Sequence, residues 1–220
     1  MTQTKSKSRI RDHGEVFTNK REVNAMLNLV EQEVVRIESR FLEPACGSGN
    51  FLIEILNRKL DVVTTKYKKS QLDWERYAFV AISSIYGIDI LPDNVDDCRE
   101  NLYNAFVEKY RSVYKKKTQE CFFPIIEHVL SQNILLGNAL TMKMIGTNQP
   151  IIFAEWTLTG GSMVKRKDYV FEELLLSDKN AKNIDLFSLN IQSDTGHPVF
   201  IPNSIKIYPK IHFMKVRDNE

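Results

Sequence analysis

Hydrophobic residues in the first third of the chain follow two spacings. Apolar side chains recur every three or four positions over residues 23–37 and again over residues 52–67, which places them on one face of a helix. Between these stretches, the short apolar pair Phe41-Leu42 indicates a buried strand. Thr18 stands before the first stretch and is a candidate N-cap. The pattern therefore predicts a helix, a strand and a second helix.

The same alternation of patterns continues through the middle of the chain. Pro92 stands where a helix can begin, because its fixed φ angle suits the first turn. The polar and proline-containing sequence after Ser177 is typical of an edge strand or irregular chain. Helices are expected over residues 71–85, 92–113, 121–130 and 168–176, and strands over residues 86–90, 133–137 and 150–156.

The order of these elements predicts the fold class. Strands that alternate with helices imply an α/β domain with a doubly wound, mostly parallel sheet and helices on both faces. Such a sheet binds its ligands at the carboxyl ends of the strands. We expect this domain to cover residues 1–178, with a C-terminal tail, residues 179–220, packed on the domain or extending it.

Composition excludes several classes of protein. Hydrophobic residues make up 43% of the 220 positions, which is enough for a sizeable core and argues against a disordered chain. No apolar run approaches the roughly 20 residues of a membrane helix, and the polar, basic N-terminus has no signal-peptide core. Three cysteines without CxxC spacing argue against a zinc site or a disulfide framework and for the reducing cytoplasm. With a net charge of only +2, any nucleic-acid surface must be local.

A turn rich in small residues follows the first predicted strand, in the sequence FLEPACGSGNF (41–51). Small residues let the backbone approach a ligand closely. A phosphate-binding P-loop would carry a lysine after its last glycine, where this chain has Asn50. A dinucleotide-binding turn usually has a third glycine three positions after Gly49, where this chain has Leu52. Neither phosphate-binding motif is complete.

Two acids at predicted strand ends favour a different ligand. Glu43 would repel a pyrophosphate in a low-dielectric cleft and would attract a cation. S-adenosylmethionine carries an ammonium and a sulfonium, has no phosphate, and offers a carboxylate to backbone N–H groups. Asp89 ends the next strand, where an acid can accept hydrogen bonds from both ribose hydroxyls. The turn and the acids together therefore fit S-adenosylmethionine better than NAD, although each acid taken singly could cap a helix.

Three segments resemble a known family. FLEPACGSGNFL, the upstream GEVFTNKREVNAML and the downstream YGIDILPDNVDDCRENL are similar to segments of the N6-adenine-specific DNA methyltransferases of restriction–modification systems. The resemblance implies a Rossmann-like, S-adenosylmethionine-dependent methyltransferase fold. Where the family often has Gly-Asp, this chain has Gly137-Asn138, so the amide oxygen of Asn138 would meet the adenine amine of the cofactor. The other residues that the resemblance assigns to the cofactor are Phe17, Thr18, Glu43, Ala45, Cys46, Gly47, Gly49, Asp89 and Ile90.

The catalytic motif of that family is missing from this chain. The family carries Asn/Asp-Pro-Pro-aromatic after its fourth strand, where the first residue accepts from the target amine and the aromatic stacks on a flipped base. The corresponding place here reads PIIFAEW (150–156), so Glu155 and Trp156 are the candidate acceptor and stacking residue. The alternative is that Glu155 is a strand-end acid and Trp156 a core or rim aromatic. Lys165-Arg166-Lys167 could touch phosphates or form a solvated loop.

The sequence therefore supports one leading function and one alternative. The leading function is an S-adenosylmethionine-dependent DNA methyltransferase, specific for the N6 amine of adenine, in a restriction–modification system. The alternative is a cofactor-binding subunit or regulator without catalysis of its own. DNA is the expected partner, together with a second restriction–modification subunit if target recognition is supplied in trans. The four histidines are scattered without metal-ligand spacing, so no metal site is expected.

Overall fold

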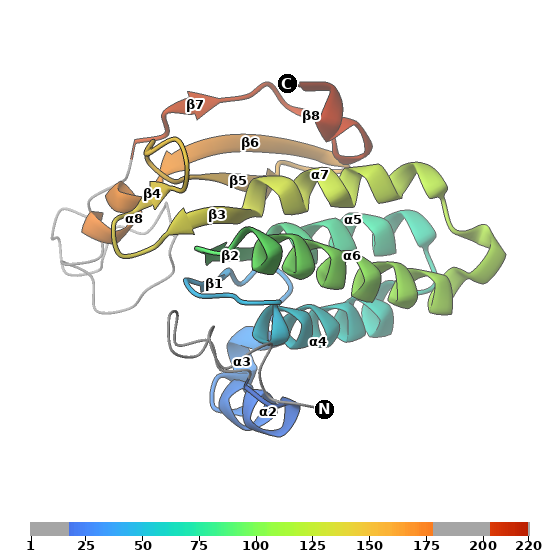
Figure 1. The fold of residues 1–220 in the computed structure, drawn as a ribbon. Helices are drawn as coiled ribbons and strands as arrows, with labels where there is room; N and C mark the ends of the chain where they lie inside the picture. The colour runs from blue at the N-terminus through green and yellow to red at the C-terminus, as the bar shows by residue number, and fades with distance from the viewer. Residues whose placement is uncertain (1–17, 178–202, 220) are drawn as a thin grey trace, which may run out of the picture.

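The computed structural model describes residues 18–177 and 203–219 of the chain. Helices and strands alternate through residue 138, and further strands follow (Figure 1). The helices are α2 (Lys20–Asn28), α3 (Glu31–Val34), α4 (Asn50–Tyr67), α5 (Gln71–Ser83), α6 (Pro92–Tyr114), α7 (Phe123–Asn133) and α8 (Phe171–Ser177). The strands are β1 (Phe41–Glu43), β2 (Ile85–Asp89), β3 (Ile134–Asn138), β4 (Lys143–Met144), β5 (Ile152–Leu158), β6 (Met163–Val170), β7 (Lys206–Ile207) and β8 (Ile211–His212).

The first four strands form one sheet in the order β1-β2-β3-β4. β1, β2 and β3 are parallel, with Phe41 opposite Ile85 and Gly87 opposite Ile134, whereas the short β4 is antiparallel to β3. Helices α4 and α5 connect β1 to β2, and α6 and α7 connect β2 to β3. The three parallel strands therefore end at the same edge of the sheet. This arrangement confirms the α/β class with a parallel sheet at its centre.

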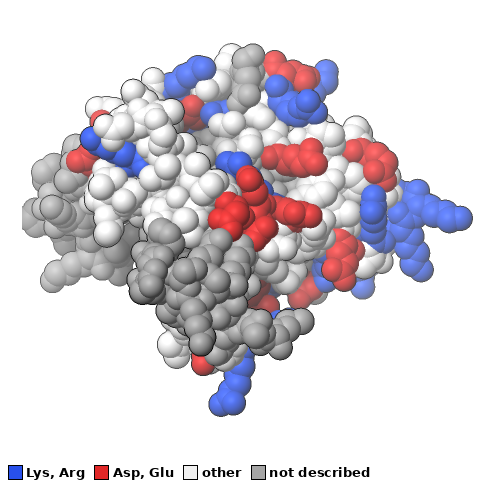
Figure 2. Space-filling view, in the orientation of Figure 1, with Lys and Arg blue, Asp and Glu red and all other residues white. Residues whose placement is uncertain are grey.

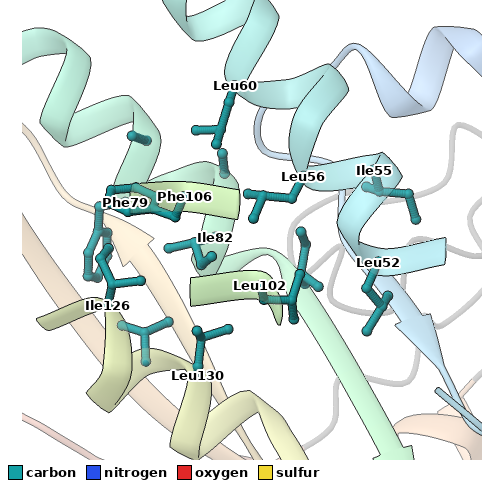
Figure 3. Close-up of a cluster of buried hydrophobic side chains, with 14 of the residues drawn as sticks. Leu52, Ile55, Leu56, Leu60, Phe79, Ile82, Leu102, Phe106, Ile126 and Leu130 are labelled. Carbon is teal, nitrogen blue, oxygen red and sulfur yellow. The ribbon is translucent and has the colours of Figure 1, made fainter. Parts of the chain in front are cut away.

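One face of this parallel sheet is covered by helices. Side chains alternate between the two faces of a strand, and Ile85 and Ile134 project into the core formed with α4, α5, α6 and α7. Burial of this apolar surface is the main favourable contribution to folding here. Figure 3 shows side chains from all four helices meeting in this core, namely Leu52, Ile55, Leu56, Leu60, Phe79, Ile82, Leu102, Phe106, Ile126 and Leu130.

The other face of the parallel sheet is covered mainly by a second sheet, where sequence analysis expected more helices. Tyr86 and Ile88 of β2 pack there against Phe153 and Tyr169 of the second sheet, with Phe171 at the start of α8. The second sheet has the order β5-β6-β7, and β8 also pairs with β6. A sheet can cover this face because each of its strands, like a helix, offers one apolar side.

The prediction that residues 150–156 form a fourth parallel strand is wrong. β5 pairs antiparallel with β6, from Ile152 opposite Val170 to Leu158 opposite Val164. The turn between them contains Gly160 and Gly161, both at positive φ, which only glycine adopts readily. Residues 163–170 therefore form a strand, and the helix expected from residue 168 begins only at Phe171.

The remaining helix predictions hold except at the N-terminus. A single helix was expected over residues 23–37, but α2 ends at Asn28 and α3 is a separate short helix. Asn19, not Thr18, is the N-cap of α2, because its Oδ1 accepts a hydrogen bond from the Glu22 backbone N–H at 3.0 Å. Asparagine is among the most favourable N-cap residues.

The described C-terminal residues, 203–219, pack on the second sheet and the helices. β7 and β8 pair antiparallel with β6, and Phe213 and Val216 of the following 3₁₀ helix are buried in the helical core. Among the described residues, no helix is both long enough and apolar enough to cross a membrane.

Candidate functional site

The parallel strands β1, β2 and β3 end at the same edge of their sheet (Figure 1). A cleft of about 600 Å³ lies at these carboxyl ends. Its volume is in the range of cofactor-binding sites. The residues that line it come from the ends of β1, β2 and β3, from the turn after β1 and the start of α4, from the loop after β3, from the start of α6, and from the segment before α2. They are Thr18, Glu43, Pro44, Ala45, Cys46, Gly47, Ser48, Asn50, Phe51, Asp89, Ile90, Leu91, Asn94, Asn138, Ala139 and Leu140.

The glycine turn has the left-handed backbone that its sequence suggested. Gly47 has φ +51° and Gly49, the N-cap of α4, has φ +92°. A Cβ atom at Gly49 would lie 2.8 Å from the Sγ atom of Cys98 on α6, so a side chain there would also clash. The Cys46 N–H donates to the Ile88 carbonyl oxygen at 2.9 Å, which fixes the turn to β2. Gly49 therefore packs against α6 and does not line the cleft, whereas Gly47 and Cys46 line it.

Asp89 at the end of β2 joins the turn to the start of α6. Its Oδ2 accepts from the Gly47 backbone N–H at 2.9 Å, and its Oδ1 accepts from the Leu91 backbone N–H at 2.9 Å. The Asn94 side-chain amide donates to the same Oδ1 at 3.3 Å. A carboxylate has about four lone-pair sites, so these three bonds leave capacity for a ligand hydroxyl. Asp89 therefore both holds the turn and faces the cleft.

Glu43 at the end of β1 is a partly buried acid in the same cleft. Burial raises the pKa of its carboxyl group, while a hydrogen bond from the Ala45 backbone N–H acts in the opposite direction. Burial raises a carboxyl pKa because desolvation disfavours the charged form. A cationic ligand group beside Glu43 would lower this pKa and would itself be stabilised.

Cys46 lines the cleft as a small packing residue. A hydrogen bond with the Cys98 thiol, followed by burial, raises the pKa of the Cys46 thiol. The thiolate is the nucleophilic form of cysteine, so this environment suppresses covalent chemistry at Cys46.

Asn138 at the end of β3 lines the cleft, but not in the way its sequence position suggested. Its Oδ1 accepts from the backbone N–H groups of Leu140 at 2.9 Å and Thr141 at 3.2 Å, which caps the loop after β3. The amide oxygen is therefore occupied by the protein's own loop. The amide nitrogen, a donor, is the group that can face a ligand.

The structure brings most of the proposed cofactor residues together. Thr18, Ala45 and Ile90 line the cleft with the residues already described, and Gly49 lies behind it. Phe17 lies outside the described residues. Asn94 was missed by sequence reasoning, although an amide in the first turn of a helix that follows an acidic strand end is a usable signal. Further lining residues that were not anticipated are Pro44, Ser48, Asn50, Phe51, Leu91, Ala139 and Leu140.

The proposed catalytic pair lies elsewhere, in the middle of β5. Glu155 is 4% exposed, and its Oε1 accepts from the Arg40 guanidinium at 2.7 Å. Trp156 is 8% exposed; its indole N–H donates to Asn133 Oδ1 at 3.2 Å, and its ring packs edge-on against Phe79. Neither residue lines the cleft, because β5 pairs with β6 instead of extending the parallel sheet. Trp156 is a core aromatic, as the alternative had it, whereas Glu155 does not end a strand but pairs with Arg40 from the middle of β5.

The charges around the cleft suit a ligand that carries positive charge and no phosphate. Of the described residues that line it, Glu43 and Asp89 are acidic and none is a lysine or an arginine. In the orientation of Figure 1, the surface of the molecule carries acidic side chains near its middle and a group of basic side chains at one end (Figure 2). Helix α6 starts at the cleft and has 23 residues, so it is about 34 Å long. The basic run Lys115–Lys117 follows its far end and therefore lies far from the cleft. No group of acids, histidines and cysteines suited to a metal ion occurs among the described residues.

The basic run 165–167 is part of β6 rather than a free loop. The Arg166 guanidinium donates to Asp168 Oδ1 at 2.7 Å and stacks over the Tyr208 ring at 4.5 Å from its centroid. Arg166 therefore stabilises the second sheet, and its charge is largely balanced within the protein.

Comparisons with known proteins point to the same segment of the chain. Residues 23–122 match the family described as UPF0020: RMKL-like, methyltransferase domain. This match covers the turn after β1, Asp89 and Asn94. The chain therefore has a Rossmann-like methyltransferase fold, and over less than half of its length it is similar to this methyltransferase family.

A relative from Methanocaldococcus jannaschii is 28% identical over 134 residues and is named "Putative type II restriction enzyme and methyltransferase". The matched region covers 60% of this chain and 10% of that protein, so the chain spans about a tenth of the length of its relative. No solved structure matches the chain significantly.

Proposed function

We propose that the cleft binds S-adenosylmethionine and that the domain serves methylation of DNA, at the N6 amine of adenine, in a restriction–modification system. One observation carries the cofactor proposal. Two acids and the start of helix α4, at Asn50 and Phe51, meet in one cleft, and none of the described residues lining it is cationic. Methyltransferases of this class generally use S-adenosylmethionine, which has the complementary charges.

Each part of the cleft then has a role toward the cofactor. Glu43 attracts the ammonium group. The backbone N–H groups of the first turn of α4, where Asn50 and Phe51 line the cleft, meet the methionine carboxylate, because the helix dipole favours an anion there. Asp89 accepts from the ribose hydroxyls while keeping its bond to the Gly47 N–H. The Asn138 amide nitrogen can donate to a ring nitrogen of the adenine. Bound in this way, the cofactor supplies an electrophilic methyl group.

The DNA substrate is supported by similarity and by the name of one relative. The Methanocaldococcus jannaschii protein is named as both a restriction enzyme and a methyltransferase. Each of the three sequence segments that resemble adenine-specific DNA methyltransferases contributes at least one described residue to the wall of the cleft, and the N-terminal segment contributes Thr18. Adenine as the base and a restriction–modification system as the setting are our extension of this similarity.

A second function has specific support: a cofactor-binding subunit that needs a partner for catalysis. The cleft contains no counterpart of the Asn/Asp-Pro-Pro-aromatic motif among the described residues. Glu155 and Trp156 are bonded to Arg40 and Asn133 in the core, so we do not propose them as the catalytic pair. In this case a second restriction–modification subunit would provide the acceptor group and target recognition.

One experiment separates these functions. The purified chain is incubated with S-adenosylmethionine carrying a radiolabelled methyl group and with mixed-sequence DNA, with RNA and protein as alternative substrates. Label on adenine N6 supports the leading function. Binding of S-adenosylmethionine by calorimetry, without label on any substrate, favours the partner-dependent subunit. Absence of cofactor binding would contradict both.

A further inference from the structure

A group of exposed lysines lies at the far end of α6 from the cofactor cleft. Two segments distant in the sequence form it, the turn between α4 and α5 and the 3₁₀ helix that follows α6. We call this group the lysine patch; its members are Lys68, Lys69, Lys115, Lys116 and Lys117. Figure 2 shows basic side chains gathered at the end of the molecule where, in Figure 1, α6 leads toward α7. The patch is therefore outside the site already described.

Side chains join the two segments of the patch through their backbones. The Tyr114 hydroxyl donates to the Lys68 carbonyl oxygen at 3.2 Å, and the Gln71 side-chain amide donates to the Lys117 carbonyl oxygen at 2.8 Å. The fully buried Trp74 packs edge-on against the Tyr114 ring, with centroids 5.7 Å apart, which holds Tyr114 in place. Because these hydrogen bonds use backbone oxygens, they bring the two segments together and leave the ammonium groups of the lysines exposed.

Acids near the patch are paired with other cations. Three carboxylates each form an ion pair with a lysine or an arginine outside the patch. These pairs are Asp61 with Lys109, Asp73 with Arg76 and Glu120 with Arg111. Among the described residues, no acid forms an ion pair with a lysine of the patch. The five positive charges therefore have no partner in the described part of the chain that would neutralise them.

The patch carries more positive charge than the chain as a whole. The chain has a net charge of +2, so without these five lysines the remaining residues would have a net charge of −3. At the other end of α6, the cofactor cleft is lined by Glu43 and Asp89 and by no lysine or arginine among the described residues. A polyanion that approaches the molecule is therefore attracted to the patch rather than to the cleft.

The side chains of the patch suit phosphates better than bases. A lysine ammonium is a compact charge on a flexible stem, which contacts a phosphate but lacks the planar geometry that recognises a base edge. Tyr67 and Tyr77, which flank the turn between α4 and α5, stack on each other with centroids 4.0 Å apart. One face of each ring is thus already covered, whereas single strands bind by stacking their bases on open aromatic rings. The patch therefore favours the backbone of a duplex over a single strand.

We propose that the lysine patch is a second DNA contact, which binds the phosphates of duplex DNA independently of sequence. The choice of DNA as the polyanion rests on the proposed function. Duplex DNA carries one negative charge per about 1.7 Å of its axis, so several lysines engage the same duplex at once. A duplex held there raises the concentration of DNA beside the cleft and adds affinity without specificity.

The length of α6 sets the scale of this contact. The helix is about 34 Å long, which corresponds to about ten base pairs at 3.4 Å each. The lysine patch therefore contacts a duplex about one helical turn or more away from any base that reaches the cofactor cleft.

A footprint of the lysines tests the contact directly. The full chain, without cofactor, is treated briefly with an acetylating reagent, with and without a duplex of about 20 base pairs, which is longer than α6. Mass spectrometry then reports the modification of each lysine. We expect the duplex to reduce acetylation of the lysine patch severalfold and to leave Lys210 and Lys215, which are exposed on the C-terminal segment, unchanged. No protection of the patch, or equal protection of Lys210 and Lys215, would overturn the proposal.

A pair of charge-matched variants gives the second test. Lys116→Gln/Lys117→Gln removes two charges from the patch, and Lys210→Gln/Lys215→Gln removes two exposed charges elsewhere. Each lost phosphate contact lowers the slope of log affinity against log salt by about 0.9, so the patch variant should lose about two in slope and about tenfold or more in affinity at about 0.1 M salt. The control variant should change neither quantity appreciably. Fluorescence anisotropy with two duplexes of unrelated sequence measures both.

The outcomes of this titration are unambiguous because the substituted side chains are exposed, so both variants should keep the melting temperature of the unaltered chain. Equal weakening in the two variants would mean that net charge, and not the patch, governs DNA binding. A loss confined to one of the two duplexes would contradict a sequence-independent contact. Vesicles of phosphatidylserine and phosphatidylcholine are the other arm: tighter binding to them than to the duplex, lost in the patch variant, would assign the patch to a membrane surface instead.

The failure of this proposal can be distinguished from failure of the proposed function, because duplex binding is measured without cofactor. If the patch variant binds the duplex as tightly as the unaltered chain, the lysine patch is not a DNA contact, whatever the cleft binds. If duplex binding depends on the patch but S-adenosylmethionine does not bind the chain, the proposed function fails and the DNA contact stands.

Discussion

The parallel sheet with the cofactor cleft and the second sheet differ in how their polar residues are used. At the cleft, the buried acid Asp89 accepts from backbone N–H groups close to a ligand-sized space. In the second sheet, the equally buried Asp168 is paired with Arg166 at 2.7 Å. The first arrangement leaves an acid ready for a ligand, whereas the second neutralises it. Burial of an acid is therefore not a sign of function until its partners are known.

The largest expected effect is on stability, at the contact between the two regions. Glu155→Ala removes one partner of a buried ion pair and leaves Arg40 partly buried without it, which typically costs about 3–5 kcal/mol. We expect a loss of this order in urea unfolding, with S-adenosylmethionine affinity retained in the folded fraction. If Glu155→Ala is as stable as the unaltered chain but cannot methylate DNA, Glu155 is catalytic after all and its structural role here is wrong.

The next effect compares the two buried acids. Asp89→Ala loses bonds to the turn and to the ligand, and charge-assisted hydrogen bonds of about 1.5–3 kcal/mol correspond to a tenfold to hundredfold weaker affinity. Asp168→Ala is the matched control, because Asp168 is 7% exposed against 8% for Asp89. It should destabilise the fold and leave the affinity unchanged. Calorimetry with S-adenosylmethionine measures both, and equal affinities in the two variants would remove Asp89 from the site.

Sequence reasoning succeeded where the signals are local. The turn after β1 could be read because Glu43, Gly47 and Gly49 lie within seven positions, and a strand–turn–helix order fixes their geometry. Asp89 could be placed beside them because parallel strands end at one edge.

Sequence reasoning failed where pairing is long-range. The apolar run of β5 is compatible with either a parallel or an antiparallel strand, and its choice depends on β6 and on the partners of Glu155 and Trp156. The pairing of Arg40 with Glu155 spans 115 positions and leaves no local pattern. The amide oxygen of Asn138 was expected to meet the cofactor, but it accepts from the N–H groups of the loop after β3. The conformation of this loop, which the strand before it does not reveal, decides which amide atom is available to a ligand.

Two glycines at positive φ, one beside the cofactor cleft and one in the second sheet, extend the comparison of the two regions with smaller expected effects. Gly49→Ala combines backbone strain at φ +92° with a contact of 2.8 Å to Cys98 Sγ. Gly161→Ala in the β5–β6 turn has φ +56° and no atom within 4 Å of the added Cβ. Backbone strain alone costs about 1–2 kcal/mol for such a residue, so Gly161→Ala should lower the free energy of unfolding by about that amount. We expect Gly49→Ala to lower the free energy of unfolding further and to weaken S-adenosylmethionine binding, as measured by thermal shift with the ligand. Equal losses of stability in the two variants would show that the Cys98 side chain moves aside at no energetic cost.

The smallest expected effect concerns two cations with different partners, the buried Lys59 and the partly buried Arg166. Arg166 of the second sheet has a carboxylate partner, whereas Lys59 of α4 donates to the carbonyl oxygens of Ile37 and Ser39 and to the Ser84 hydroxyl. Burial lowers the pKa of Lys59 to about 7, from an ordinary value near 10.5. The three oxygens favour the protonated amine, so we expect the effect on stability to be modest.

The direction of this pH effect follows from proton binding. Between pH 7 and about pH 10 the unfolded chain keeps the Lys59 proton more fully than the folded chain, so the free energy of unfolding rises with pH in this window. Below pH 7 both states are protonated, and the cost of burying the charge is fully present. Lys59→Met has no such group, so its stability relative to the unaltered chain should be highest near pH 6 and should fall toward pH 9.5. Urea unfolding of both chains at pH 6, 7.5 and 9.5 measures this difference. A difference that is constant with pH would mean that the three oxygens keep Lys59 protonated throughout, and that a buried lysine held by carbonyl groups behaves like the carboxylate-paired Arg166.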